Sequence, residues 1–186
     1  MRSRDSKRLV VNASVARAAG GEEATVSVSI SCTEFLETFR DECPHHVVMT
    51  PELSEEWHTN QSKFAAGWLK SMIARKRWDY VEPPVNQALR DEIEETATSE
   101  TEIREMRRDF HLLEAAQATD QTVASLDESI RQLFARATQG VGEIRDIVWV
   151  NPERTAEEQP LAWLQNGAPP EDHRKLRVWE DTFLEK

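Results

Sequence analysis

The feature that most constrains this chain is the alternation of short β-branched segments with long segments of helical periodicity. The strand-like segments lie between turn residues, at 8–12, 46–50, 122–125 and 146–150. The helical segments are 33–42, 51–73 as one or two helices, 85–95, 99–119 and 127–138. Parallel strands need long crossover connections, and helices of this length supply them. The pattern therefore predicts an α/β fold with a doubly wound, parallel sheet.

Two local signals indicate where helices begin. Pro51 is well placed as the first residue of a helix, because its missing N–H is not needed there. Ser99 and Glu102 have the spacing of a capping box, in which each side chain bonds the backbone N–H of the other residue.

The length of 186 residues fits one hydrophobic core with a short extension. Because the composition changes after Asn151-Pro152, we expect a main domain at residues 1–152 and a C-terminal extension at 153–186. The extension contains Trp163, Trp179 and Phe183, and such large rings are rarely left in water. It is therefore expected to pack on its own domain or on a partner chain.

The composition is 39% hydrophobic and 31% charged, which is typical of a folded globular chain. No segment approaches the roughly 18 apolar residues that a membrane-spanning helix needs, so we expect no membrane contact and a cytoplasmic location. The net charge of -11 means that any contact with nucleic acid must come from local basic patches.

The two cysteines, Cys32 and Cys43, lie eleven residues apart in what reads as one helical stretch. Such a stretch would separate them by roughly 16 Å, too far for a disulfide. No zinc-ligand spacing surrounds them, so both are expected to be reduced thiols.

Polar residues follow the predicted strands, where open α/β sheets bind ligands. Asn12 follows the first strand, and Glu55 and Glu56 lie in the helix after the second. Asp127 follows the third strand, and Asp109 lies in the helix that leads into it. Carboxylates that meet at one sheet edge repel one another unless a cation neutralises them, and an all-oxygen set suits Mg²⁺ or Mn²⁺.

In this order, these segments resemble the PIN-domain (PilT N-terminus-like) metal-dependent nucleases. That family has a strand ending in Asp, a Glu in the helix after the second strand, an Asp opening a later helix, and a strand followed by Ser/Thr-x-Asp. The resemblance covers about residues 8–152 and matches Glu56, Asp109 and Asp127 to acidic positions. Glu55 is the alternative to Glu56, and Asp120 is a candidate accessory residue. A PIN-like three-layer fold is implied, with a mostly parallel central sheet of about four to five strands and helices on both faces.

Asn12 departs from the family pattern, because it stands where the family has Asp. A neutral amide is a poorer ligand for a hard dication than a carboxylate. Two explanations are open: an inactivating substitution introduced into this chain, or a natural member that is weakened or inactive.

The resemblance implies an endoribonuclease that hydrolyses phosphodiester bonds of RNA with bound Mg²⁺ or Mn²⁺. The implied catalytic residues, which are also the metal ligands, are Asn12, Glu56, Asp109 and Asp127. Many small relatives are toxins of toxin–antitoxin systems. The implied partners are therefore an RNA substrate such as tRNA or mRNA, an antitoxin protein and a second copy in a homodimer.

The candidate substrate-binding residues lie beside these acids, and they are Ser14, Arg17, Ser125 and Arg108. The basic segment 75–77 beside Trp78 could also contact single-stranded nucleic acid, but helix ends often carry basic residues for electrostatic reasons. His45, His46 and His58 lack the spacing of a metal site, so they are expected to be surface or core histidines.

Two other functions compete with a nuclease. A catalytically inactive RNA- or protein-binding module could keep the same fold and use its crevice or its C-terminal extension. A phosphoacceptor receiver domain would need an early acidic pair and a Lys after a late strand, and neither is evident in this sequence.

Overall fold

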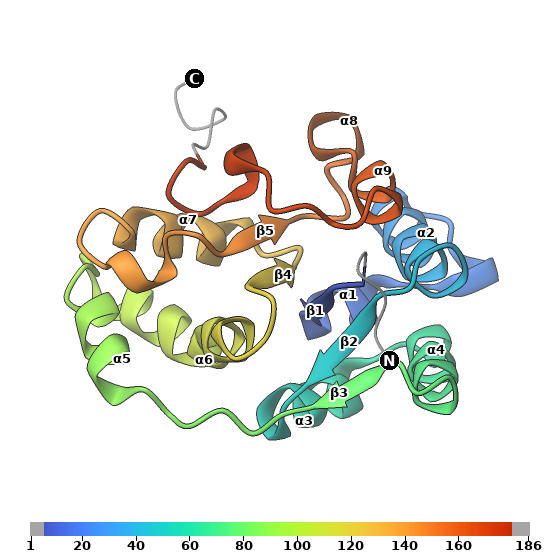
Figure 1. Cartoon of the computed structure of the whole chain (residues 1–186), viewed down its shortest axis with the longest axis horizontal. Helices are drawn as coiled ribbons and strands as arrows, with labels where there is room; N and C mark the ends of the chain where they lie inside the picture. The colour runs from blue at the N-terminus through green and yellow to red at the C-terminus, as the bar shows by residue number, and fades with distance from the viewer. Residues whose placement is uncertain (1–5, 180–186) are drawn as a thin grey trace.

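The computed structural model describes residues 6–179 (Figure 1). Within them, one sheet has the strand order β3-β2-β1-β4-β5, and every neighbouring pair is parallel. The strands are β1 (Arg8–Val11), β2 (His46–Met49), β3 (Trp78–Tyr80), β4 (Thr122–Ala124) and β5 (Val148–Val150). The predicted α/β class and the parallel sheet of four to five strands are confirmed.

Helices cover both faces of this sheet. The α-helices are α1 (Ala13–Ala18), α2 (Ser27–Asp41), α3 (Pro51–Asn60), α4 (Lys63–Ala74), α5 (Gln87–Glu94), α6 (Glu100–Gln117), α7 (Glu128–Ala137), α8 (Thr155–Glu158) and α9 (Pro160–Gln165). Short 3₁₀ helices are η1 (Gly21–Glu23), η2 (Gly142–Ile144) and η3 (Asp172–Arg174). Helix α6 packs on β1, β4 and α7, while α2 packs with α1, α4 and α9 on the opposite side (Figure 1).

The strands are short apolar runs because the helices bury them from both sides. Every residue from Leu9 to Val11 is fully buried, and so are Val47 and Val123 on the neighbouring strands. Aromatic rings fill both helical layers, with the Trp57 and Trp68 indoles stacked 5.9 Å apart.

The predicted helix starts are largely confirmed. The Thr50 hydroxyl accepts from the backbone N–H of Leu53 just before Pro51, which is the first residue of α3. The 51–73 segment forms two helices, because the Ser62 side chain caps a second helix at its start. The Ser99 side chain caps α6, but Glu102 accepts from Thr98 rather than from Ser99, so the reciprocal capping box is only half formed.

Three elements differ from the sequence predictions. Strand β3 was not predicted. It has only three residues, pairs with β2 at the edge of the sheet and stays partly exposed, so its sequence needs no continuous apolar run. Helix α1 has six residues, too few to show helical periodicity. Helix α2 begins at Ser27 and not at residue 33, because its first two turns are rich in serine, which predicts helix weakly.

The cysteines are both free and buried, as expected for reduced thiols. Cys32 lies in α2, but Cys43 lies beyond the end of that helix at Asp41, so the prediction of one shared helical stretch is wrong. Burial raises the pKa of the Cys32 thiol to about 12 and that of Cys43 to about 11. Neither thiol is therefore activated as a nucleophile.

Residues 153–179 lie against the rest of the chain. Helix α9 packs on α2, and its Trp163 side chain is 2% exposed, with Nε1 donating to the Pro169 carbonyl. The half-buried Trp179 packs against the core and lies under the Arg131 guanidinium, 4.9 Å from the ring centre. Phe183 lies outside the described residues.

Because the Trp163 ring is buried in the core, Trp163→Ala should destabilise the protein by about 3 kcal/mol and lower Tm by roughly 6 to 12 °C. Urea unfolding and thermal melts measure both quantities. Val178→Ala is the matched control, since Val178 is 41% exposed and the change should cost under about 1 kcal/mol. Equal small effects of the two changes would contradict core packing by Trp163.

Candidate functional site

The strand order reverses at β1, which is the position where open α/β sheets form a ligand crevice. A pocket of about 380 Å³ lies there, at the carboxyl ends of β1 and β4. Its lining residues are Asn12, Ala13, Ser14, Arg17, Glu56, Asn60, Arg108, Asp109 and Asp127. All four residues matched to the family's acidic positions thus face one pocket.

Asn12 is the first residue after β1 and is 7% exposed. Its backbone N–H donates to the Ala124 carbonyl at 2.9 Å, which continues the pairing of β1 with β4. Its side-chain Nδ2 donates to the Ser125 Oγ, also at 2.9 Å. The amide of Asn12 is therefore held by a defined hydrogen bond at the floor of the pocket.

Asp127 reaches the pocket from the loop after β4. Its backbone N–H donates to Ser125 Oγ at 3.1 Å, and its Oδ1 accepts from Ile130 N at 3.0 Å and caps α7. Ser125 is fully buried beneath Asn12 and does not line the pocket. The prediction that Ser125 contacts a substrate is therefore corrected, because its hydroxyl accepts from Asn12 and Asp127 inside the fold.

Ser14 lines the pocket, but its hydroxyl is also used by the fold. The Ser14 Oγ accepts from Leu126 N at 3.2 Å, which ties α1 to the loop that carries Asp127. Because that bond uses only a lone pair, the hydroxyl proton can still be donated to a bound group.

Glu56 is placed by the residue that follows it. The indole of Trp57 is 1% exposed and donates to the Val11 carbonyl at 2.9 Å, which fastens α3 to the end of β1. This contact brings Glu56 beside Asn12 in the pocket. Glu55 lines only the neighbouring hollow, so Glu56 is the better placed of the two alternatives.

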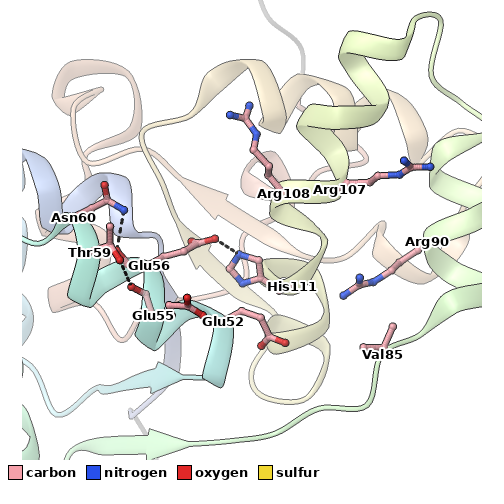
Figure 2. A pocket seen from close by; sticks show the side chains of 10 residues that line it. All are labelled: Glu52, Glu55, Glu56, Thr59, Asn60, Val85, Arg90, Arg107, Arg108 and His111. Atoms are coloured by element: carbon pink, nitrogen blue, oxygen red, sulfur yellow. Dashed lines mark hydrogen bonds and ion pairs between the residues drawn. The ribbon is translucent and has the colours of Figure 1, made fainter.

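His111 is the main site residue that sequence reasoning missed. Its Nε2 lies 2.9 Å from Glu56 Oε1, and because the carboxylate accepts, this nitrogen donates (Figure 2). The side chain is 8% exposed, and its Nδ1 is buried without a hydrogen-bond partner among residues 6–179. Residues two apart on a helix point in different directions, so a site at Asp109 does not predict that His111 also lies in it.

Asn60 was also missed, although a sequence signal for it exists. It lies four residues after Glu56 in α3, and residues at that spacing share a helix face. Both side chains line the pocket, and Asn60 Nδ2 donates to the Glu56 backbone carbonyl.

Asp109 lies in the middle of α6 and not at a helix start, because the Ser99 cap begins this helix ten residues earlier. Burial raises the pKa of its carboxyl to about 6. The neighbouring His111 lowers that pKa, whereas the negative charges of Asp127 and Glu56 raise it. The site thus holds a carboxyl whose ionised form is destabilised by its surroundings.

Two cations border the acidic pocket. Arg17 and Arg108 are exposed, line the pocket, and form no hydrogen bond or ion pair with other described residues. The charge of Arg108 lowers the pKa of Asp109, which places it electrostatically next to the acids. Both guanidinium groups are available to an anionic ligand.

A second hollow of about 480 Å³ continues the pocket and shares Glu56, Asn60 and Arg108 with it (Figure 2). Glu52 and Glu55 of α3 form one wall, and Arg90 and Arg107 lie on the other (Figure 2). These two arginines already pair with Glu114 and Glu94. Arg108 therefore differs from them in lacking a carboxylate partner within the described chain.

Other candidate residues lie elsewhere. Asp120 accepts from the Arg8 backbone and side chain at the amino end of β1, opposite the pocket, so its predicted accessory role is wrong. Arg77 donates to the carbonyls of Phe39, Arg40 and His45, and thus caps the end of α2. This contact agrees with the helix-end interpretation of segment 75–77.

The three histidines considered from sequence lie in separate places. His45 is fully buried, with Nε2 on the Leu164 carbonyl, and burial lowers its pKa. His46 pairs with Asp79, and His58 is exposed at the end of α3. They match the expected surface and core histidines.

The oxygen donors of the pocket suit a hard dication but do not close around one. Within residues 6–179, no three His, Cys, Asp or Glu side chains are grouped closely enough to hold a metal ion. Two features of this site bear on its donor set. Position 12 carries an amide, and the Glu56 carboxylate is turned toward His111.

Comparisons with known proteins give no relative: no protein-family model, curated protein or solved structure matches this chain. Among the described helices, none has both the length and the apolar character needed to cross a membrane.

The raised pKa of Asp109 predicts a pH-dependent stability. The folded protein binds this proton more tightly than the unfolded chain, whose Asp pKa is near 3.8, so stability falls as pH rises from about 4 to above 6. Asp109→Asn removes that penalty and should stabilise the metal-free protein by about 1 to 2 kcal/mol at pH 7.5. The gain should disappear near pH 4.

Urea unfolding in chelator at pH 4, 5.5 and 7.5 measures this difference. Asp91→Asn is the control, because Asp91 is exposed on α5 and its substitution should change stability by under about 0.5 kcal/mol. A pH-independent effect of Asp109→Asn would contradict the raised pKa.

Proposed function

We propose that this chain has the site of a PIN-like, metal-dependent endoribonuclease, weakened by Asn12. One observation carries the proposal: three carboxylates from three separate segments face one pocket together with Asn12, at the carboxyl ends of the neighbouring strands β1 and β4. Such a group of acids costs stability unless a cation joins it. Proteins keep arrangements of this kind mainly where they serve a function.

In the proposed mechanism, Asp109, Asp127, Glu56 and residue 12 would hold Mg²⁺ or Mn²⁺. The metal would supply an activated water and stabilise charge on the scissile phosphate of RNA. The chain's own contribution is to fix these ligands. Ser125 holds residue 12, the cap of α7 holds Asp127, and His111 orients Glu56.

Arg17 and Arg108 would bind the phosphates on either side of the bond that is cut. Their guanidinium groups are exposed and have no carboxylate partner within residues 6–179, so binding a phosphate breaks no existing ion pair. The overall charge of -11 makes such local cations necessary for RNA binding. The choice between tRNA and mRNA, an antitoxin partner and a homodimer remain predictions from the resemblance, and a cytoplasmic location remains a prediction from the apolar pattern of the sequence.

Restoring the carboxylate tests the proposal. Asn12→Asp adds a negative charge beside Asp109 and Asp127, so it should lower Tm in chelator through like-charge repulsion. In millimolar Mn²⁺ or Mg²⁺ it should raise Tm, because the ion binds the native state, and it should confer cleavage of RNA. Thermal melts with and without metal, and a gel assay on total RNA including tRNA, measure the three effects.

The added Asp109→Ala change should abolish that cleavage, whereas a contaminating ribonuclease would be unaffected. If Asn12→Asp protein shows neither metal-linked stabilisation nor cleavage, the nuclease proposal is wrong.

RNA binding can be measured on the present chain, because the Asn12 protein is expected to cut RNA poorly. Arg108→Ala should weaken binding of a single-stranded RNA about 3- to 10-fold at low salt. It should also lower the slope of the logarithm of the binding constant against the logarithm of salt concentration by the amount expected for about one phosphate contact. Arg104→Ala is the matched control, one turn earlier on the same exposed face of α6. Fluorescence anisotropy at several salt concentrations measures both, and equal effects would argue against a specific phosphate site.

A non-catalytic RNA-binding module is the second candidate, and the Asn12–Ser125 hydrogen bond favours it. The Asn12 amide donates to a hydroxyl that also accepts from Asp127, so the amide is well accommodated. This candidate predicts that the present chain binds RNA and that Asn12→Asp confers no cleavage.

A further inference from the structure

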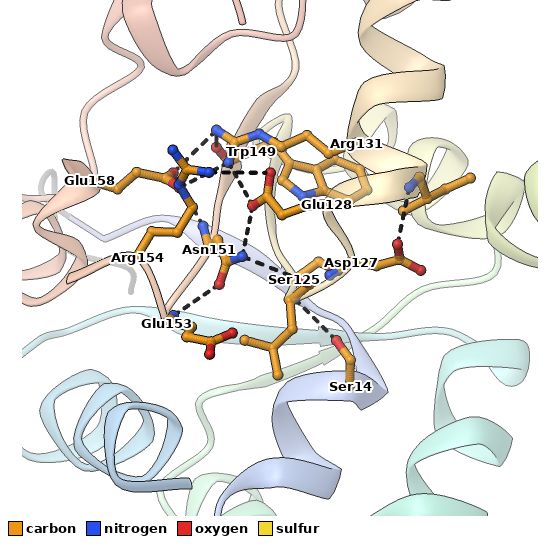
Figure 3. Close-up of polar contacts among 12 residues, drawn as sticks. Ser14, Ser125, Asp127, Glu128, Arg131, Trp149, Asn151, Glu153, Arg154 and Glu158 are labelled. Carbon is orange, nitrogen blue, oxygen red and sulfur yellow. Dashed lines mark hydrogen bonds and ion pairs between the residues drawn. The ribbon is translucent and has the colours of Figure 1, made fainter. Parts of the chain in front are cut away.

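The loop that carries Asp127 is held from outside the pocket by Asn151, the residue after β5 (Figure 3). Asn151 is 2% exposed. Its Nδ2 donates to Glu128 Oε1 at 2.7 Å and lies 3.5 Å from the Leu126 carbonyl. One buried amide therefore contacts both chain neighbours of Asp127.

Asn151 also contacts the C-terminal segment, through its side-chain oxygen and its backbone N–H. Asn151 Oδ1 accepts from the backbone N–H of Glu153 at 2.9 Å, and the Asn151 N–H lies 3.3 Å from Glu158 Oε1. Asn151 thus links the Asp127 loop to helix α8.

A buried charge pair fixes α8 in this position (Figure 3). The Arg131 side chain is 2% exposed, and its two terminal nitrogens donate to the two Glu158 oxygens at 2.9 and 3.1 Å. Arg131 also donates to the Trp149 carbonyl at 2.8 Å. A buried guanidinium is strongly unfavourable without its carboxylate, so Glu158 is held firmly against the end of the sheet.

We propose that Asn151 is a positioning residue for Asp127, and that Glu158 of α8 completes the buried network that fixes it. The claim rests on the proposed metal-binding role of Asp127. Because Oδ1 of Asp127 is used to cap α7, only the placement of its loop decides how the carboxylate meets the other ligands. Residues behind a metal ligand commonly change metal affinity by 10- to 100-fold.

The first experiment measures Mn²⁺ affinity by calorimetry in the Asn12→Asp background. Adding Asn151→Ala should weaken Mn²⁺ binding at least tenfold. Glu128→Ala should do the same, because it removes both the acceptor of Asn151 and a carboxylate that lies 3.3 Å from Arg131 Nη1. Glu128→Gln should weaken binding less than Glu128→Ala, because its amide oxygen still accepts from Asn151 although the charge facing Arg131 is lost. Glu158→Gln should weaken binding through the loss of the Arg131 ion pair.

Leu164→Ala is the matched control. Leu164 is fully buried in α9, beyond α8 in the same C-terminal segment, and its side chain makes no bond to the network. This change should lower Tm without altering Mn²⁺ affinity beyond twofold. An equal loss of affinity in Leu164→Ala would show that stability alone is responsible and would overturn the proposal.

The second experiment needs no metal. In the present chain, Asn151→Ala should speed amide hydrogen exchange at residues 126–130 at least tenfold more than it speeds exchange in the rest of the protein. Leu164→Ala should produce no such local increase at these residues. If Asn12→Asp protein binds no Mn²⁺, the proposed function fails, and exchange at 126–130 still decides the role of Asn151. Unchanged exchange or unchanged Mn²⁺ affinity in Asn151→Ala would overturn the positioning role.

Discussion

The parallel pairing of β1 with strands on both sides is the constraint on which the rest of the structure depends. All strands point the same way, so their carboxyl ends share one edge of the sheet. The connections turn outward in opposite directions from β1, and this reversal leaves a crevice between β1 and β4. Asn12 and Asp127 reach that crevice simply because they follow these strands.

Charge is distributed differently inside and outside the crevice. Two buried or half-buried acids elsewhere on α5 and α6 are paired with arginines, Glu114 with Arg90 and Glu94 with Arg107. In the pocket, Asp109 faces other carboxylates and has its pKa raised by burial and by their charges. A fold alone would favour pairing these groups, so their convergence is the feature that supports the proposed binding site.

Much of the fold could be predicted from sequence because local patterns carry it. The buried strands are continuous apolar runs, and local signals such as Pro51 and Ser99 mark the helix starts. Asn12, Glu56 and Asp127 could be proposed because residues that follow parallel strands meet at one edge, whereas Asp109 was proposed from the family resemblance. Strand β3 and helix α1 were not predicted, because elements of three and six residues are too short to show a recognisable periodicity.

By itself, the sequence determined the α/β class, the parallel sheet and which polar residues follow its strands, because hydrophobic periodicity and turn chemistry are local properties. Only the tertiary structure decided which of these residues meet. It placed Asp120 at the opposite edge, buried Ser125 beneath Asn12, and brought His111 to Glu56. These contacts join residues 55 to 113 positions apart. They depend on the pairing of β1 with β4 and on the packing of α3 against α6, which no local pattern records.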